Sequence, residues 1–245
     1  MKHAHGADPT QMRDPVLVAR SVARSYGGNP ALRGMSLHVE RGEILAITGP
    51  SGSGKSTLLL CLAGVLRPDA GEIRLVGRDG SGERVISAES EADRSRLRRT
   101  RFGVLFQFGQ LVPELTAAEN VALPLLLEGG RRRPALSVAR DWLDRFDVAE
   151  LAGVRPSEMS GGQAQRVAVA RAMVTEPEVL FADEPTAALD TVSGDRVLAQ
   201  LVRVTREART SVVLVTHDTR VAAHGDREIV LRDGVVAGHE LPAPA

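Results

Sequence analysis

The pattern of apolar and polar positions predicts strands in both halves of the chain. Met35, Leu37 and Val39 alternate with polar neighbours, the two-residue period of a strand with one buried face. Further stretches of strand length stand at 16–22, 44–48, 73–75, 179–182 and 212–216. Near the carboxyl end, Asp233-Gly234 separates apolar triplets at 229–231 and 235–237, which indicates a β-hairpin.

Helical signals dominate the middle of the chain. Val138, Trp142 and Phe146 share one helical face. Thr116 and Glu119 have the spacing of a capping box. Helices are predicted at about 54–66, 160–174 and 192–209, and the charged segment 77–99 is predicted as a loop leading into a short helix.

The order of these elements predicts an α/β fold. Strand–helix–strand succession implies a parallel sheet with right-handed crossovers. A helical insert at about 110–160 interrupts this core. We expect one domain over 16–239, with flexible tails at 1–15 and 240–245.

Composition narrows the functional classes. The formal net charge is zero, so there is no overall electrostatic footprint for nucleic acid, and the short arginine runs at 96–101 and 131–133 are expected to be solvated surface. The chain has one cysteine, which suits a reducing compartment. Its longest apolar run, near 58–66, is far short of the roughly 20 residues that span a membrane, and residues 1–15 lack a secretory pattern. We expect a soluble or peripheral protein.

A complete phosphate-loop motif follows the strand at 44–48. Its pattern, G-x-x-x-x-G-K-[ST], is made by Gly49, Pro50, Ser51, Gly52, Ser53, Gly54, Lys55, Ser56 and Thr57. Glycines let backbone N–H groups converge on phosphate oxygens, and the start of the next helix adds positive potential there. Lys55 can reach the β- and γ-phosphates of ATP, and the Ser56 hydroxyl can bind Mg²⁺.

Two adjacent carboxylates end the apolar strand at 179–182. Successive side chains of a strand diverge, so Asp183 and Glu184 can serve different purposes. Asp183 is predicted to hold Mg²⁺ through water. Glu184 is predicted to act as the general base on the attacking water.

One motif separates this chain from kinases, GTPases and helicases. Met159-Ser160-Gly161-Gly162-Gln163 resembles the signature of ABC ATPases, and the likeness extends from about residue 16 to 238. A serine and glycine N–H groups at the start of a helix form an anion site. In this family two subunits pair head to tail, so the resemblance implies that Ser160, Gly161, Gly162 and Gln163 meet the ATP held by a second copy.

The resemblance also implies roles for single residues outside these motifs. Tyr26 matches the aromatic that stacks on adenine, and Gln107 matches the Q-loop glutamine near Mg²⁺ and the attacking water. Asp190, in Ala188-Leu189-Asp190, resembles the D-loop residue across the dimer. His217 resembles the switch histidine that contacts the γ-phosphate. Glu184, His217 and Gln107 are thus the expected catalytic residues.

The resemblance further implies a P-loop NTPase core with a parallel sheet, an N-terminal antiparallel β subdomain and a helical subdomain that carries the signature. It also implies a subunit that hydrolyses ATP on the cytoplasmic face of a membrane and powers a separate permease. The segments 119–125 and 155–163 look like the macrolide-export and lipoprotein-release group, with Met159 in place of the usual leucine and Ala187 in place of the usual glycine. A single phosphate loop argues against two-cassette ribosomal proteins. The absence of long heptad arms argues against DNA-repair ATPases. A cell-division ABC complex, which transmits force instead of moving a solute, remains an alternative. The segment 108–127 is expected to dock the permease.

Overall fold

The computed structural model describes residues 14–77, 82–107 and 110–237. Most of the two predicted tails falls outside these ranges; β1 already begins at Pro15. In the described part, no helix combines the length and the apolar character needed to cross a membrane.

An antiparallel sheet forms the amino-terminal part of the fold. Its strands lie in the order β2-β1-β4-β5. Their bounds are Pro15–Tyr26 for β1, Asn29–Glu40 for β2, Ala70–Val76 for β4 and Glu83–Val85 for β5. Met35, Leu37 and Val39 are buried on one face of β2 while their neighbours are exposed or half-buried, as the alternating pattern predicted.

A six-stranded sheet forms the centre, in the order β10-β9-β3-β8-β7-β6. The bounds are Ile44–Thr48 for β3, Phe102–Leu105 for β6, Val179–Asp183 for β7, Ser211–Val215 for β8, Arg227–Arg232 for β9 and Val235–Ala237 for β10. All neighbours pair in parallel except the β9–β10 hairpin. The parallel strands therefore end at one edge of the sheet.

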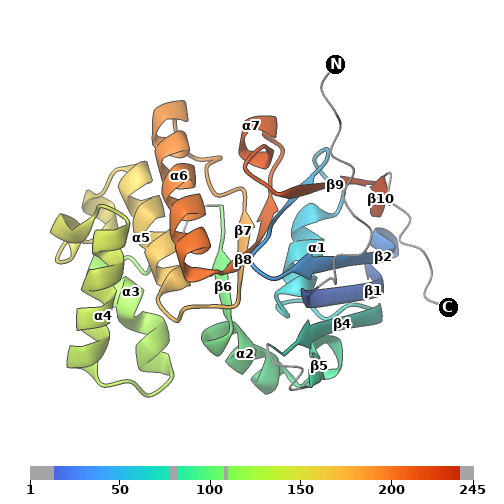
Figure 1. The fold of residues 1–245 in the computed structure, drawn as a ribbon, viewed down its shortest axis with the longest axis horizontal. Coiled ribbons are helices and arrows are strands. Elements are labelled where there is room, and N and C mark those ends of the chain that lie inside the picture. The colour runs from blue at the N-terminus through green and yellow to red at the C-terminus, as the bar shows by residue number, and fades with distance from the viewer. Residues whose placement is uncertain (1–13, 78–81, 108–109, 238–245) are drawn as a thin grey trace.

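Helices cover this sheet on both sides (Figure 1). They are α1 (Lys55–Leu62), α2 (Glu91–Thr100), α3 (Ala117–Leu127), α4 (Arg132–Arg145), α5 (Gly161–Met173), α6 (Thr191–Ala208) and the short α7 (Thr219–Ala222). Figure 1 places α3, α4 and α5 together at one end of the molecule, and α1 beside the antiparallel strands at the other.

The parallel sheet divides the core into two apolar clusters. Val212 and Leu214 of β8 pack with α3, α4, α5 and α6, whereas Val213 and Val215 pack with α1 and the antiparallel sheet. Because strand side chains alternate between faces, each central strand contributes to both clusters. This double burial explains why these strands read as unbroken apolar runs.

The predicted elements agree with the structure except at a few places. Strand β5 lies in the segment 77–99, which was predicted as a loop leading into a short helix. Strand β6 was not predicted, because four residues next to an arginine run carry too little pattern. Helix α7 was also missed. The helix predicted over 54–66 ends at Leu62, before the proline at 68 that was expected to stop it.

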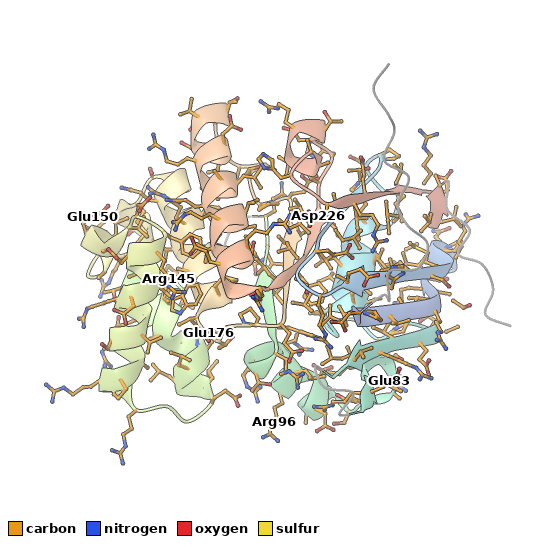
Figure 2. All side chains as sticks on the ribbon, in the orientation of Figure 1. Glu83, Arg96, Arg145, Glu150, Glu176 and Asp226 are labelled. Atoms are coloured by element: carbon orange, nitrogen blue, oxygen red, sulfur yellow. The ribbon has the colours of Figure 1, made fainter. Side chains whose placement is uncertain are left out.

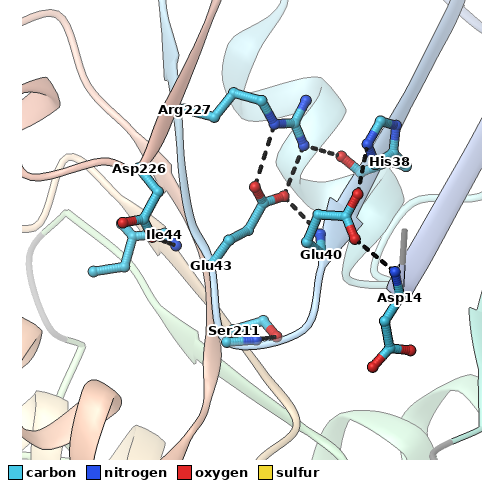
Figure 3. A network of polar contacts seen from close by, with 9 residues as sticks. Asp14, His38, Glu40, Glu43, Ile44, Ser211, Asp226 and Arg227 are labelled. Atoms are coloured by element: carbon cyan, nitrogen blue, oxygen red, sulfur yellow. Dashed lines mark hydrogen bonds and ion pairs between the residues drawn. The ribbon is translucent and has the colours of Figure 1, made fainter. Parts of the chain in front are cut away.

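A polar network joins the turn between β2 and β3 to β9 (Figure 3). The Arg227 guanidinium donates to Glu43 Oε1 at 2.7 Å and to the carbonyl of His38 at 2.6 Å. The Ile44 N–H donates to Asp226 Oδ2 at 2.8 Å. These bonds fix the antiparallel sheet to the central sheet just before the strand that carries the phosphate loop.

The arginine run at 131–133 is exposed, as predicted, whereas in the run at 96–101 only Arg96 is exposed and the other arginines are half-buried. Figure 2 shows Arg96 projecting outward from α2, where the residue is exposed. Arg98 pairs with Glu91 at 2.7 Å and Arg99 with Glu128 at 2.5 Å. This part of α2 is therefore a charged face on which ion pairs partly cover the arginine side chains.

Candidate functional site

The phosphate loop runs from the end of β3 into α1, as the sequence predicted. Gly49 and Gly54 have φ of 141° and 100°, in the region that favours glycine. A Cβ at Gly49 would lie 2.1 Å from the carbonyl oxygen of Leu231, and one at Gly54 would lie 2.3 Å from that of Ala31. Both the backbone conformation and the lack of space therefore require glycine.

Lys55 is the first residue of α1 and is 8% exposed. Its ammonium donates to the carbonyl oxygens of Gly49 at 2.8 Å and Pro50 at 2.9 Å. The ammonium of Lys55 thus bonds back to the first two residues of the phosphate loop. Gly54 precedes the helix without a side-chain cap, so the N–H groups of the first turn stay available to an anion.

Asp183 stands at the end of β7, close to this loop. Burial raises the pKa of its carboxyl, a hydrogen bond from Ser56 opposes that rise, and the charge of Glu184 adds to it. Asp183 Oδ1 is buried and has no hydrogen-bond partner among the described residues. An unpartnered carboxylate oxygen beside a serine hydroxyl fits a hard cation such as Mg²⁺, which needs few protein ligands when phosphate oxygens supply others.

Glu184 and His217 are brought together from two neighbouring strand ends. Glu184 has a left-handed φ of 47°, and its N–H donates to the carbonyl of Val215 at 2.9 Å. Its Oε1 lies 2.6 Å from His217 Nδ1, and its Oε2 accepts from the Thr216 hydroxyl at 3.1 Å. A strained backbone at a residue with this many partners is typical of a functional site.

The signature residues begin α5, with Ser160 as the N-cap. The Gln163 N–H donates to Ser160 Oγ at 3.3 Å, and the Ser160 N–H donates to Gln163 Oε1 at 2.8 Å. A cavity of about 250 Å³ opens here, lined by Ser160, Gly162, Gln163, Arg166, Ser193, Arg196 and Val197. Among the described residues, no hydrogen bond joins these signature residues to the phosphate loop.

The sequence model of the ABC transporter family matches residues 32–187. This chain belongs to the ABC transporter family. It is 43% identical over 227 residues to the lipoprotein-releasing system ATP-binding protein LolD 2 of Caulobacter vibrioides, covering 91% of this chain and 97% of LolD 2. It is 42% identical to the macrolide export ATP-binding/permease protein MacB 1/2 of Paracoccus denitrificans, covering 94% of this chain but 34% of MacB.

Solved structures of ABC cassettes share the fold. A dimeric bacterial ABC transporter cassette superposes with a TM-score of 0.81 at 34% identity, covering 91% of this chain and 97% of that one. The same values hold for a dimeric ATP-binding cassette in a post-hydrolysis state, bound to ADP and Pi. These likenesses confirm the predicted family and fold, and with them an ATP-binding ABC subunit that hydrolyses ATP.

Three other predicted site residues of this ABC ATPase lie in separate places. Gln107 is exposed in the turn directly after β6, the strand that the sequence did not reveal. Tyr26 ends β1 and is 47% exposed, with the Arg24 guanidinium 5.4 Å from its ring centroid. Asp190 caps α6, accepting from the Ser193 N–H at 3.0 Å. Their roles toward nucleotide stay predictions.

Ala187, where related ATPases usually have glycine, lies in the turn after Glu184. Its N–H donates to the Glu184 carbonyl at 3.2 Å. Ala187 does not have a positive φ, so its backbone conformation does not require glycine. Met159, the other departure, packs half-buried against the core of the helical cluster, where a side chain of similar volume fits.

One residue of the site was missed from the sequence. Thr216 bonds to Glu184 through its side chain and is 1% exposed. The available signal was its position, a hydroxyl residue directly after a fully apolar strand and directly before the predicted switch histidine.

Proposed function

We propose that this ABC ATPase drives a separate membrane permease of an export or lipoprotein-release system, and that it works as a head-to-tail dimer closed by ATP. The observation that best supports the proposed dimer is that the site residues lie in two separate parts of the subunit. The phosphate loop, Asp183, Glu184 and His217 gather at the edge of the sheet, while the signature serine caps a different helix without a hydrogen bond to them. A second copy can bring its signature helix to the first copy's nucleotide.

The relatives support the permease. LolD is named as the ATP-binding protein of a lipoprotein-releasing system, and MacB as an ATP-binding/permease protein of macrolide export. This chain spans about a third of MacB and 97% of LolD 2, and the similarity to LolD 2 over nearly its full length supports a permease supplied by another polypeptide. We accordingly assign the subunit to the cytoplasmic face of the membrane as a peripheral protein. The same names favour release or export over the cell-division alternative.

Each residue of the site has a proposed part in hydrolysis. The loop N–H groups and Lys55 bind the phosphates, and Tyr26 stacks on adenine. Ser56, Gln107 and Asp183 hold Mg²⁺, which neutralises phosphate charge when bound. Glu184 takes the proton of the attacking water, and His217 turns from Glu184 to the γ-phosphate. Asp190 and the signature residues contribute across the dimer.

The composite site predicts a selective defect for Ser160→Arg. Ser160 is exposed at the start of α5, so an arginine there places a bulky cation where the other copy's γ-phosphate must dock. The isolated subunit should still bind ATP, because its phosphate loop is unchanged. Dimerisation with ATP and hydrolysis should both fail, the latter on the order of 10²-fold or more. Equilibrium binding, light scattering and phosphate release measure the three properties.

Ser137→Arg is the matched control, because Ser137 is exposed on α4 and takes no part in the proposed dimer. Normal turnover of Ser160→Arg would contradict the head-to-tail arrangement.

The segment predicted to dock the permease folds around one buried amide. Residues 108 and 109 lie outside the described part. Asn120 is fully buried, and its side chain bonds to the N–H of Val112 at 2.7 Å and to the carbonyls of Val112, Leu115 and Thr116 at 3.0–3.1 Å. Val112 and Leu115 are half-buried, so the apolar patch is less exposed than the sequence suggested. A preformed loop of this kind can still serve as one wall of a docking groove.

Docking predicts that Val112→Glu combined with Leu115→Glu uncouples the subunit from its permease. The side-chain hydrogen bonds of Asn120 go only to main-chain atoms of this loop, so the loop should persist and basal ATP hydrolysis should stay within about twofold. Co-purification with the permease and stimulation by it should be lost. Val235→Glu, at a valine that is 43% exposed in β10 and lies outside the segment 108–127, is the control. A double variant that still responds to the permease would place the docking face elsewhere.

A further inference from the structure

Thr216 lies where the base, the switch histidine and the phosphate-loop strand meet. We propose that Thr216 is a positioning residue, whose hydroxyl holds the carboxylate of Glu184 in the orientation needed for hydrolysis. This inference rests on the proposed role of Glu184 as the base.

The direction of the Thr216 hydroxyl is fixed by its two partners. The backbone N–H of Asp218 donates to Thr216 Oγ1 at 3.1 Å. A hydroxyl has one proton, and an N–H group can only donate. The proton of Thr216 is therefore free to point at Glu184 Oε2, which lies 3.1 Å away. At 1% exposure, no bulk water competes for it.

The backbone of Thr216 is anchored to the strand that carries the phosphate loop. Its N–H donates to the carbonyl of Ile47 in β3 at 3.1 Å, two residues before Gly49. The N–H of Glu184 donates to Val215, the neighbour of Thr216 in β8. The Glu184 carboxylate is thus fixed relative to the loop that holds the γ-phosphate, through one buried residue.

Thr216 and His217 divide the two oxygens of Glu184 between them. His217, with a side chain that is 65% exposed, contacts Oε1, whereas buried Thr216 holds Oε2. When His217 turns toward the γ-phosphate, Oε1 becomes available to the attacking water. The bond from Thr216 keeps the carboxylate from rotating away at that moment, since a misplacement of about 1 Å can cost on the order of a hundredfold in rate.

The test compares Thr216→Val with Thr216→Ser. Valine keeps the shape and removes the hydroxyl, so kcat should fall on the order of tenfold to a hundredfold while KM for ATP stays unchanged. Serine keeps the hydroxyl and should restore kcat to within about threefold of the parent. Thr216→Ala removes the hydroxyl without adding a methyl group, and it replaces the valine variant if that variant does not fold.

Thr210→Val is the matched structural control. Thr210 is 3% exposed, and its hydroxyl donates to the carbonyl of Pro177 at 3.0 Å, remote from Glu184. Loss of this bond should lower the melting temperature without changing kcat. If Thr216→Val behaves in the same way, Thr216 is only structural and the inference is wrong.

A double variant separates this inference from the assignment of the base. Thr216→Val added to Glu184→Gln should leave the residual rate of Glu184→Gln unchanged, because two residues that act as one unit are not additive. A further loss would mean that Thr216 acts elsewhere. Normal kcat in Thr216→Val with an inactive Glu184→Gln overturns the inference alone, whereas normal turnover in Glu184→Gln overturns the base and the inference together.

Discussion

Replacing Glu184 with glutamine is expected to lower ATP turnover on the order of 10²–10⁴-fold while ATP binding persists. Glutamine keeps the shape of the side chain, and its amide oxygen can still accept the Thr216 hydroxyl that bonds to Glu184 Oε2 at 3.1 Å. An amide cannot, however, take the proton of the attacking water. ATP should therefore remain between two subunits and hold them together.

Two measurements check this outcome. Size-exclusion chromatography with ATP should show a stable dimer, and phosphate release should be nearly absent. Glu176→Gln is the control, since Glu176 is an exposed carboxylate after α5 with a comparable left-handed φ of 51°. Hydrolysis at the parental rate in Glu184→Gln would eliminate this residue as the base.

The phosphate loop and the carboxylate pair could be predicted because each consists of residues that are contiguous in the sequence. Gly49 through Thr57 follow a buried strand and open a helix, and the structure places them so. The capping boxes at Thr116 and Ser160 were also predictable, because the two partners of each box stand three residues apart. Local spacing carries this information without knowledge of the tertiary fold.

Contacts between distant segments could not be predicted in this way. Thr216 and Glu184 are separated by 32 residues along the chain, and only the pairing of β7 with β8 brings them together. Likewise, the sequence shows Gly49 and Gly54 as part of a motif, but not that the carbonyls of Leu231 and Ala31 exclude any Cβ there. Such constraints arise from strand order, which periodicity does not specify.

The apolar residues after Gln107 show a different limit. The sequence alone predicts an exposed patch at Val112 and Leu115, because a connecting segment normally has few apolar side chains. Asn120, in the first turn of α3, instead holds this loop against the helix, because its side-chain amide accepts from the Val112 N–H and donates to the Leu115 carbonyl. A buried asparagine within a helical pattern was the available signal, but its partners are main-chain atoms that no pattern of side chains reveals.

Lys55→Ala is expected to abolish productive ATP binding. Charge-assisted hydrogen bonds to phosphate are worth about 1.5–3 kcal/mol each, and the substitution removes a donor of several. It also removes the bonds from the ammonium to Gly49 and Pro50, at 2.8 and 2.9 Å, which brace the loop. Affinity for ATP should fall by at least about tenfold per bond lost. Isothermal titration calorimetry and phosphate release measure binding and turnover.

Arginine at position 55 is not expected to restore the ATP binding that Lys55 provides. Among 31 basic residues, the chain has lysine only at positions 2 and 55, so arginine is used almost everywhere else. At Lys55 the side chain is 8% exposed and its head group lies between two carbonyls, where a compact ammonium fits and a planar guanidinium does not. Lys55→Arg should thus bind ATP nearly as poorly as Lys55→Ala, although the charge is kept. Arg140→Ala, on the exposed face of α4, controls for loss of a cation. Parental affinity in Lys55→Ala would refute the phosphate-binding role of this lysine, and parental affinity in Lys55→Arg alone would show that charge, not the shape of the head group, decides binding.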